Sequence, residues 1–190
     1  MTVLMLLSAA ALAYTVYWMR RENRRHRRDE VLIAVGFFFF FASMFVESIF
    51  EVLGTPPLML FALPALLELP LRILALVLVI LFVYAYNQMR EFTREAENVK
   101  HPELVRIGLY GYLRHPVYLG AIFWVILAFA FGPTIIKAIT LPVSIACFLT
   151  GARLEDKLNL EKFGKSYQTY MDEVTGFNVI SALRAWAKKP

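Results

Sequence analysis

Two polar blocks separated by an apolar stretch contain the residues that could do chemistry. The first runs from His101 to Tyr118 and includes the triplet Arg114-His115-Pro116, and the second runs from Arg153 to Val174. The sequence between the blocks is apolar, so one short helical hairpin would return the second block to the membrane face of the first. Basic, imidazole, carboxylate and aromatic groups brought together at a bilayer surface indicate an active site.

Each block also has a plainer interpretation. Proline is favoured in the first turn of a helix, so the triplet could simply begin an interfacial helix whose Arg and His contact lipid phosphates. Glu155 and Asp156 have lysines nearby and could belong to a solvated amphipathic helix. Tyr167 and Tyr170 could be ordinary belt residues at the membrane surface. The presence of both blocks together favours the active-site interpretation for Glu155.

The elements that would position these blocks are membrane-spanning helices. The 190-residue chain is 59% hydrophobic and 15% aromatic, which is typical of a membrane protein. Five apolar windows approach the length needed to cross a bilayer. They are Thr2–Met19, Val31–Val52, Leu71–Met89, Val117–Phe131 and Thr134–Thr150. The sequence therefore predicts an all-α, polytopic membrane protein with about five spans and a C-terminal cytoplasmic helical segment.

Residues 54–70 contain four prolines, which predicts a loop or re-entrant piece between the second and third spans. Glu47 and Glu51 lie near the outer end of the second span, and Glu68 lies in this loop, four residues before Arg72. Ionisable residues at membrane depth often have a function. Because these three lie near the interface, and Glu68 and Arg72 can pair, a structural role is favoured and a functional one is left open.

The basic residues predict the orientation of the chain. With five spans, 18 of the 20 lie on one side, and Arg72 and Lys137 are the exceptions. The positive-inside rule then predicts an external N-terminus and a cytoplasmic C-terminus. Residues 1–99 would form an N-terminal transmembrane region with a basic cytoplasmic loop at 20–30. Residues 100–190 would form a catalytic region with a cofactor-binding loop, a hairpin at 117–150 and a C-terminal helix.

Several classes of function are disfavoured by the sequence. The basic residues are spread over three cytoplasmic segments without a recognition motif, which argues against nucleic-acid binding and favours contact with anionic lipid headgroups. The single cysteine, Cys147, lies in an apolar span, so it indicates packing and excludes a thiolate metal cluster. No metal-ligand spacing is present, and no metal site is predicted.

The first block resembles the cofactor-binding stretch of the integral-membrane methyltransferases. That superfamily includes the isoprenylcysteine carboxyl methyltransferases and the phospholipid methyltransferases. The matching pattern, L-V-x-x-G-x-Y-x-x-x-R-H-P-x-Y, begins at Leu104 and ends at Tyr118. The second block is similar to the superfamily's acidic pair followed by F-G-x-x-Y-x-x-Y, which here begins at Glu155 and ends at Tyr170. The resemblance covers residues 100–179, and the first two spans match only in hydropathy.

The resemblance implies an S-adenosylmethionine-dependent enzyme that methylates a lipophilic acceptor entering from the bilayer. Carboxylates and aromatic faces attract the sulfonium of S-adenosylmethionine. Carboxylate and cationic side chains suit the amino acid end of this cofactor. The implied catalytic residues are His115, Glu155 and Arg153. The implied cofactor contacts are Pro102, Glu103, Leu104, Val105, Gly108, Tyr110, His115, Pro116, Val117, Tyr118, Glu155 and Asp156. The implied partners are the bilayer and a membrane lipid or other lipophilic small molecule, with the oligomeric state left open.

Departures from the superfamily pattern bear on the acceptor. The carboxyl methyltransferases have an Arg four residues before the first acid of the pair, where this chain has Gly151, and Arg153 is only two before it. A lipid amine or other small lipophilic nucleophile is therefore favoured over a prenylcysteine carboxylate, and for an amine His115 or a carboxylate would be the base. The main alternative is a sterol or steroid reductase, because those enzymes share an R-H-P-x-Y-x-G element. A non-catalytic membrane module is the third possibility.

Overall fold

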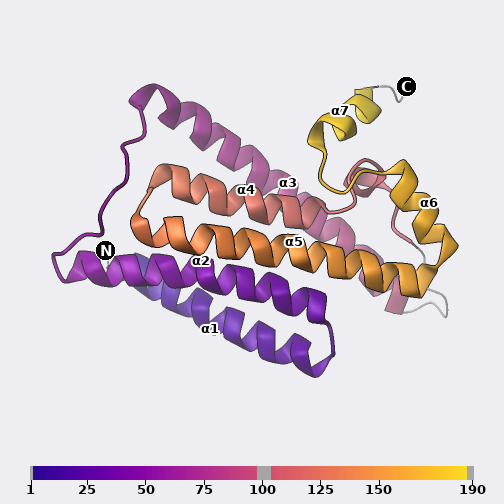
Figure 1. Cartoon of the computed structure of the whole chain (residues 1–190), viewed down its shortest axis with the longest axis horizontal. Coiled ribbons are helices and arrows are strands. Elements are labelled where there is room, and N and C mark those ends of the chain that lie inside the picture. Colours follow the sequence, from indigo (N-terminus) through magenta and orange to yellow (C-terminus); the bar gives the residue numbers. More distant parts are fainter. Residues whose placement is uncertain (1, 98–103, 188–190) are drawn as a thin grey trace. The chain divides into compact units, whose positions relative to one another are not determined.

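The described part of the chain is helical, as the sequence predicts. In a computed structural model, residues 2–97 and 104–187 are described, and they form seven α-helices, one short 3-10 helix and no β-strand (Figure 1). The elements are α1 (Thr2–Arg24), α2 (Arg28–Val52), α3 (Ala65–Glu97), η1 (Gly108–Gly111), α4 (Pro116–Phe131), α5 (Ile135–Phe163), α6 (Lys165–Glu173) and α7 (Val179–Ala187).

Four of the described helices, α1, α2, α3 and α5, are long and apolar enough to cross a membrane. Helix α4 is apolar but has only 16 residues, so it rises roughly 24 Å, against a hydrocarbon thickness of ~30 Å. The prediction of an all-α polytopic membrane protein is confirmed. The fourth predicted span, Val117–Phe131, corresponds to this shorter helix α4, which is joined to α5 by a tight turn.

The predicted boundary between the proline-rich loop and the third span is wrong. The proline-rich loop ends at Pro64, and α3 begins at Ala65 with Pro70 inside it. Pro70 removes only one backbone hydrogen bond, close to the helix start, and such interruptions are tolerated in membrane helices. Glu68 lies in the first turn of α3 and forms the predicted i,i+4 pair with Arg72, with 3.6 Å between their charged atoms.

The chain divides into two compact units. The first comprises Met1–Ala75 and Ile122–Leu154, and the second comprises Leu76–Ala121 and Glu155–Pro190. These units are defined by packing and do not test the functional division predicted at residue 100, which stays a prediction. The described residues of both polar blocks belong to the second unit, except Arg153 and Leu154, which belong to the first.

The core of the first unit forms where α2 and α5 approach closely. Gly36 lies on α2 opposite the fully buried ring of Phe148, and a Cβ at this glycine would come within 2.5 Å of that ring. The Ser144 hydroxyl donates a hydrogen bond to the Gly36 carbonyl oxygen at 2.9 Å. Helix α1 packs along α2 (Figure 1). Small and hydroxyl-bearing residues that permit close helix contact are typical of membrane helix pairs.

In the second unit, a glycine turn redirects the chain after the polar end of α5. Gly164 has φ +55°, a left-handed conformation that glycine adopts without steric cost. It ends α5 and begins α6, which carries Tyr167 and Tyr170 into the interior. After α6 the segment Thr175–Phe177, here called the strap, runs beside Leu113 in a parallel bridge.

Candidate functional site

The two polar blocks meet at His115. This residue directly precedes α4, and its side chain is 2% exposed. Its Nδ1 lies 3.4 Å from Glu155 Oε2, and its Nε2 lies 3.0 Å from Asp156 Oδ1. The hairpin thus brings together groups that are 40 residues apart in the sequence, as the spacing of the blocks predicts.

Asp156 is the most heavily contacted acid of this cluster. The Tyr167 hydroxyl donates a hydrogen bond to its Oδ1 at 2.6 Å, and Arg114 Nη2 lies 3.7 Å from its Oδ2. Together with His115 it therefore has three polar neighbours. Glu155 differs, because His115 is its one ion-pair contact among the described residues and its side chain is 32% exposed. The structure therefore leaves Glu155 the more accessible carboxylate.

Arg114 has unused hydrogen-bonding capacity. Its Nε and Nη1 are buried and have no hydrogen-bond partner among the described residues. A guanidinium with inward-pointing free donors is suited to an anionic group such as a carboxylate. Gly176 lies next to it, and a Cβ at that position would come within 3.2 Å of Arg114 Nη2. The glycine thus leaves room beside the guanidinium.

Aromatic rings enclose the His115 imidazole on two sides. Phe177 of the strap stacks on it with ring centroids 5.3 Å apart, and Tyr118 meets it edge to face at 5.6 Å. The strap itself is held by backbone bonds, since the Arg114 N–H donates to the Thr175 carbonyl at 2.9 Å and the His115 N–H donates to the Gly176 carbonyl at 3.4 Å. Sequence reasoning missed the strap, because backbone contacts leave no side-chain pattern.

The tyrosines of the second block are structural parts of the site. Tyr167 and Tyr170 are 2% and 3% exposed, so the interpretation of both as membrane-belt residues is wrong. The Tyr170 hydroxyl donates a hydrogen bond to the Tyr110 carbonyl at 2.7 Å. Arg106 lies over the Tyr170 ring at 5.2 Å and pairs with Glu173 at 3.3 Å. Burial raises the pKa of Tyr167 and Tyr170, so both phenols stay protonated donors.

The other predicted contact residues are placed as follows. Leu104, Val105 and Val117 are half-buried, Pro116 and Tyr118 are buried, and Tyr110 lies in η1. Gly108 has φ +58°, and the Gln88 side chain occupies the space beside it and accepts a hydrogen bond from the Leu109 N–H. Pro102 and Glu103 lie outside the described residues.

Arg153 is exposed on α5. Because α5 runs without a break from Ile135 to Phe163, Arg153 and Glu155 are two positions apart on one helix and point in roughly opposite directions. The position four before Glu155, which shares its helix face, is Gly151, and it is buried. This geometry favours Glu155 over Arg153 as a residue of the His115 cluster.

The protonation of His115 follows from its neighbours. Burial alone would lower the pKa of His115, but the carboxylates of Asp156 and Glu155 outweigh this effect and raise its pKa above the ordinary value. A neutral imidazole has only one N–H, whereas both ring nitrogens here face carboxylates. The cluster therefore favours the imidazolium.

We expect the stability of the protein to depend on pH through His115. A raised folded-state pKa contributes stability that is complete below the unfolded-state pKa of about 6.5 and is lost as the pH rises through the folded-state value. The melting temperature in detergent should therefore fall as the pH rises above about 6.5, and His115→Gln should flatten this fall. Equal slopes for the parent and the variant would show that the imidazolium does not stabilise the fold.

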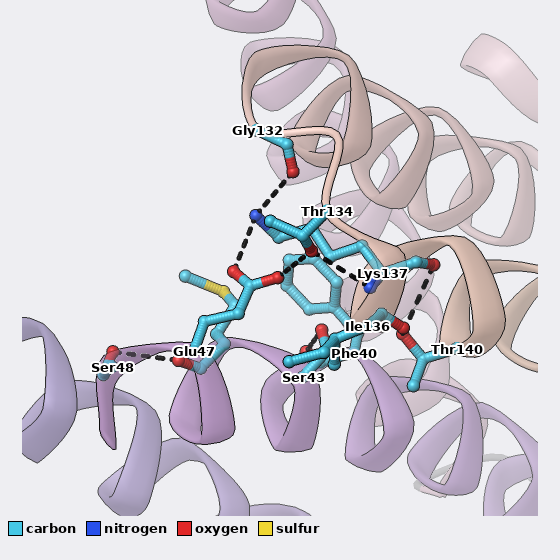
Figure 2. Close-up of polar contacts among 10 residues, drawn as sticks. Phe40, Ser43, Glu47, Ser48, Gly132, Thr134, Ile136, Lys137 and Thr140 are labelled. Carbon is cyan, nitrogen blue, oxygen red and sulfur yellow. Dashed lines mark hydrogen bonds and ion pairs between the residues drawn. The ribbon is translucent and has the colours of Figure 1, made fainter. Parts of the chain in front are cut away.

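A second polar cluster lies in the first unit, around Glu47 (Figure 2). Lys137 Nζ is 2.9 Å from Glu47 Oε2 and donates to the Gly132 carbonyl at 3.0 Å. The Thr134 hydroxyl donates to Glu47 Oε1. The two charged side chains are 12% and 15% exposed. Since both carboxylate oxygens have partners, this cluster joins α2 to the α4–α5 turn, in agreement with a structural role.

The described residues form a polytopic helical membrane protein with a partly exposed polar cluster at the start of the apolar helix α4. A family model described as "Protein of unknown function (DUF1295)" matches residues 19–174, which is most of the chain. The chain therefore belongs to the DUF1295 family. Searches of curated proteins and of solved structures found no significant match.

Proposed function

We propose that the chain is a membrane-embedded methyltransferase that transfers a methyl group from S-adenosylmethionine to a lipophilic acceptor. The observation that supports this proposal is the meeting of Arg114, His115, Glu155 and Asp156 in one partly open cluster. Their residue types and order are those of the methyltransferase pattern found in the sequence. The cluster lies at the start of the apolar helix α4, where a lipophilic acceptor could reach it from the bilayer.

The residues of the cluster fit the chemistry of this cofactor. The amino acid end of the cofactor carries a carboxylate and an ammonium group. Arg114 has buried unpaired donors that could bind the carboxylate, and Glu155 is an accessible anion that could bind the ammonium group. The rings of Phe177 and Tyr118 make the surroundings of His115 aromatic, and aromatic groups are attractive to a sulfonium. When bound, S-adenosylmethionine supplies an electrophilic methyl group. The protein then contributes orientation and exclusion of water.

The contacts suggest separate roles for the acids and for His115. Asp156 touches Arg114, His115 and Tyr167, so we assign it the positioning of these side chains. His115 has carboxylates near both nitrogens and a raised pKa, which favours the imidazolium, a hydrogen-bond donor that cannot accept a further proton. If the acceptor is an amine, its proton would therefore have to pass to a group other than this imidazolium.

The acceptor we favour is a lipid amine or another small lipophilic nucleophile. Gly151 offers no side chain on the Glu155 face of α5, so this face lacks a guanidinium that could clamp a substrate carboxylate. In mixed micelles we expect methylation of phosphatidylethanolamine and little methylation of a farnesylcysteine analogue. The two substrates are compared by transfer of label from radioactive cofactor. Efficient methylation of the farnesylcysteine, lost in Arg153→Ala and retained in Lys157→Ala, would contradict this expectation.

A reductase is the alternative supported by a specific observation. The R-H-P-x-Y-x-G element that sterol and steroid reductases share is present here at residues 114–120. Those enzymes would bind NADPH in place of S-adenosylmethionine. The unpaired donors of Arg114 could also bind a phosphate, so the ligand itself must discriminate between the two proposals.

Calorimetry on the detergent-solubilised protein tests the function. We expect binding of S-adenosylhomocysteine, the product form of the cofactor, and no binding of NADPH under the same conditions. Binding of NADPH alone would support the reductase. Binding of neither ligand by a protein with an intact melting transition would favour a non-catalytic membrane module.

We also propose that the N-terminus is external and the C-terminus cytoplasmic, on the basis of the basic-residue distribution. Arg24→Cys and Ser181→Cys, each introduced separately with Cys147→Ala, should then react with a membrane-impermeant maleimide from the same, cytoplasmic side. Both positions are exposed, so their side chains are available to the reagent. Labelling of the two positions from opposite sides would overturn the five-span arrangement.

A further inference from the structure

Helix α7 presents an apolar face that the described part of the protein leaves exposed. Val179, Ile180, Leu183 and Trp186 have the i, i+1, i+4, i+7 spacing that places side chains on one side of a helix. They are between 37% and 65% exposed. Ser181, Arg184 and Ala185 fall on the other side. Such a face is unfavourable in water, and it requires an apolar environment.

The position of α7 in the second unit indicates what that environment is. The strap precedes α7 and is bonded to Arg114 and His115, and His115 is followed directly by Pro116, the first residue of the apolar helix α4. The start of a membrane-inserted helix lies at the bilayer surface. The chain therefore enters α7 at the level of the membrane–water interface.

The composition of α7 matches that interface. Tryptophan is enriched there, and short helices with an apolar face and basic residues on the polar side lie flat in it. Arg184 lies on the polar side, and Lys188 and Lys189 follow in the sequence. These cations complement anionic lipid headgroups.

We propose that α7 lies in the interface of the chain's own bilayer, with its apolar face among the acyl chains, and thereby holds the strap against His115. The strap has two backbone hydrogen bonds and one ring stack to keep it in place. Anchoring the helix that follows limits the excursions of the strap. Membrane binding by α7 is thus coupled to closure of the polar site, whichever ligand that site binds.

The depth of Trp186 tests the first half of this proposal. With Trp18→Phe and Trp124→Phe, Trp186 is the remaining tryptophan, and the protein is studied in nanodiscs of phosphatidylcholine and phosphatidylglycerol that carry bromine at a shallow or a deep acyl position. We expect blue-shifted emission that the shallow label quenches more strongly. Leu183→Glu should shift the emission to the red and remove the quenching. The matched control Ala185→Glu, on the polar side, should leave both unchanged.

Two results would overturn the membrane assignment. Water-like, unquenched emission in the parent would place Trp186 in solvent. Blue-shifted emission without quenching by either label would mean that protein, from this chain or from a second copy, covers the face.

Hydrogen exchange tests the coupling to the site. The Arg114 amide donates to the strap, whereas the Leu119 amide donates to the His115 carbonyl at the start of α4 and serves as the internal reference. In Leu183→Glu we expect exchange at Arg114 to accelerate by roughly an order of magnitude, with no change at Leu119 and no acceleration in Ala185→Glu. Unchanged exchange at Arg114 in a variant that has lost membrane contact would show that the strap closes independently of α7.

Discussion

Glu155→Gln is expected to weaken binding of S-adenosylhomocysteine about tenfold to a hundredfold while the fold stays intact. A hydrogen bond to a charged group is worth about 1.5–3 kcal/mol, and about 1.4 kcal/mol corresponds to tenfold in affinity. Glu155 has one ion-pair contact within the described residues and is partly exposed, so its charge is available to a ligand. Removing that charge should therefore cost affinity more than stability.

Two other substitutions on α5 serve as controls for this measurement. Glu161 is exposed on the same helix, and Glu161→Gln should leave both affinity and melting temperature unchanged. Asp156 supports Arg114, His115 and Tyr167, so Asp156→Asn should lower the melting temperature as well as the affinity. Calorimetry and thermal unfolding are run on all three variants. Affinity within twofold of the parent in Glu155→Gln would show that this carboxylate does not contact the ligand.

Lys137→Met is expected to destabilise the protein by about 3–5 kcal/mol, the range observed when one partner of a buried ion pair is removed. Glu47 would keep its bond from Thr134 but lose its neutralising charge in a largely buried position. The free energy of unfolding is measured in mixed micelles with a rising fraction of denaturing detergent.

The matched control is Arg72→Met, which breaks the exposed Glu68–Arg72 pair at the start of α3. Exposed pairs of this kind contribute about 0–1 kcal/mol, so this variant should unfold close to the parent. The double variant Glu47→Gln/Lys137→Met removes both charges and should recover a large part of the lost stability. If the two single effects simply add, Glu47 and Lys137 do not act as a pair.

The meeting of the two polar blocks could be predicted from the sequence because one apolar hairpin separates them. Hydropathy gives the positions of α1 to α5, and the return of the chain to the same face follows from the number of helices between the blocks. The structure adds the specific contacts of His115 with Glu155 and Asp156, which the sequence did not single out.

The length of α5, the position of the strap and the separate roles of the two acids could not be predicted from hydropathy. Helix α5 continues past the apolar window to Phe163, because helix-forming residues such as Leu158, Glu161 and Lys162 extend it into polar surroundings. The strap is fixed through carbonyl groups that every residue has, so Thr175 and Gly176 carry no recognisable signal. The division of labour between Glu155 and Asp156 also depends on exposure, which two adjacent acids do not reveal.

The strap gives the protein a fixed order of biogenesis. Its residues follow all five apolar helices in the sequence, so Thr175 and Gly176 are synthesised after every one of these helices and only then can reach Arg114 and His115. Synthesis of the apolar helices and completion of the polar cluster are therefore successive events. A nascent chain that has already inserted its spans still has His115 without the Phe177 ring, and the cluster is completed only when this late segment has been synthesised.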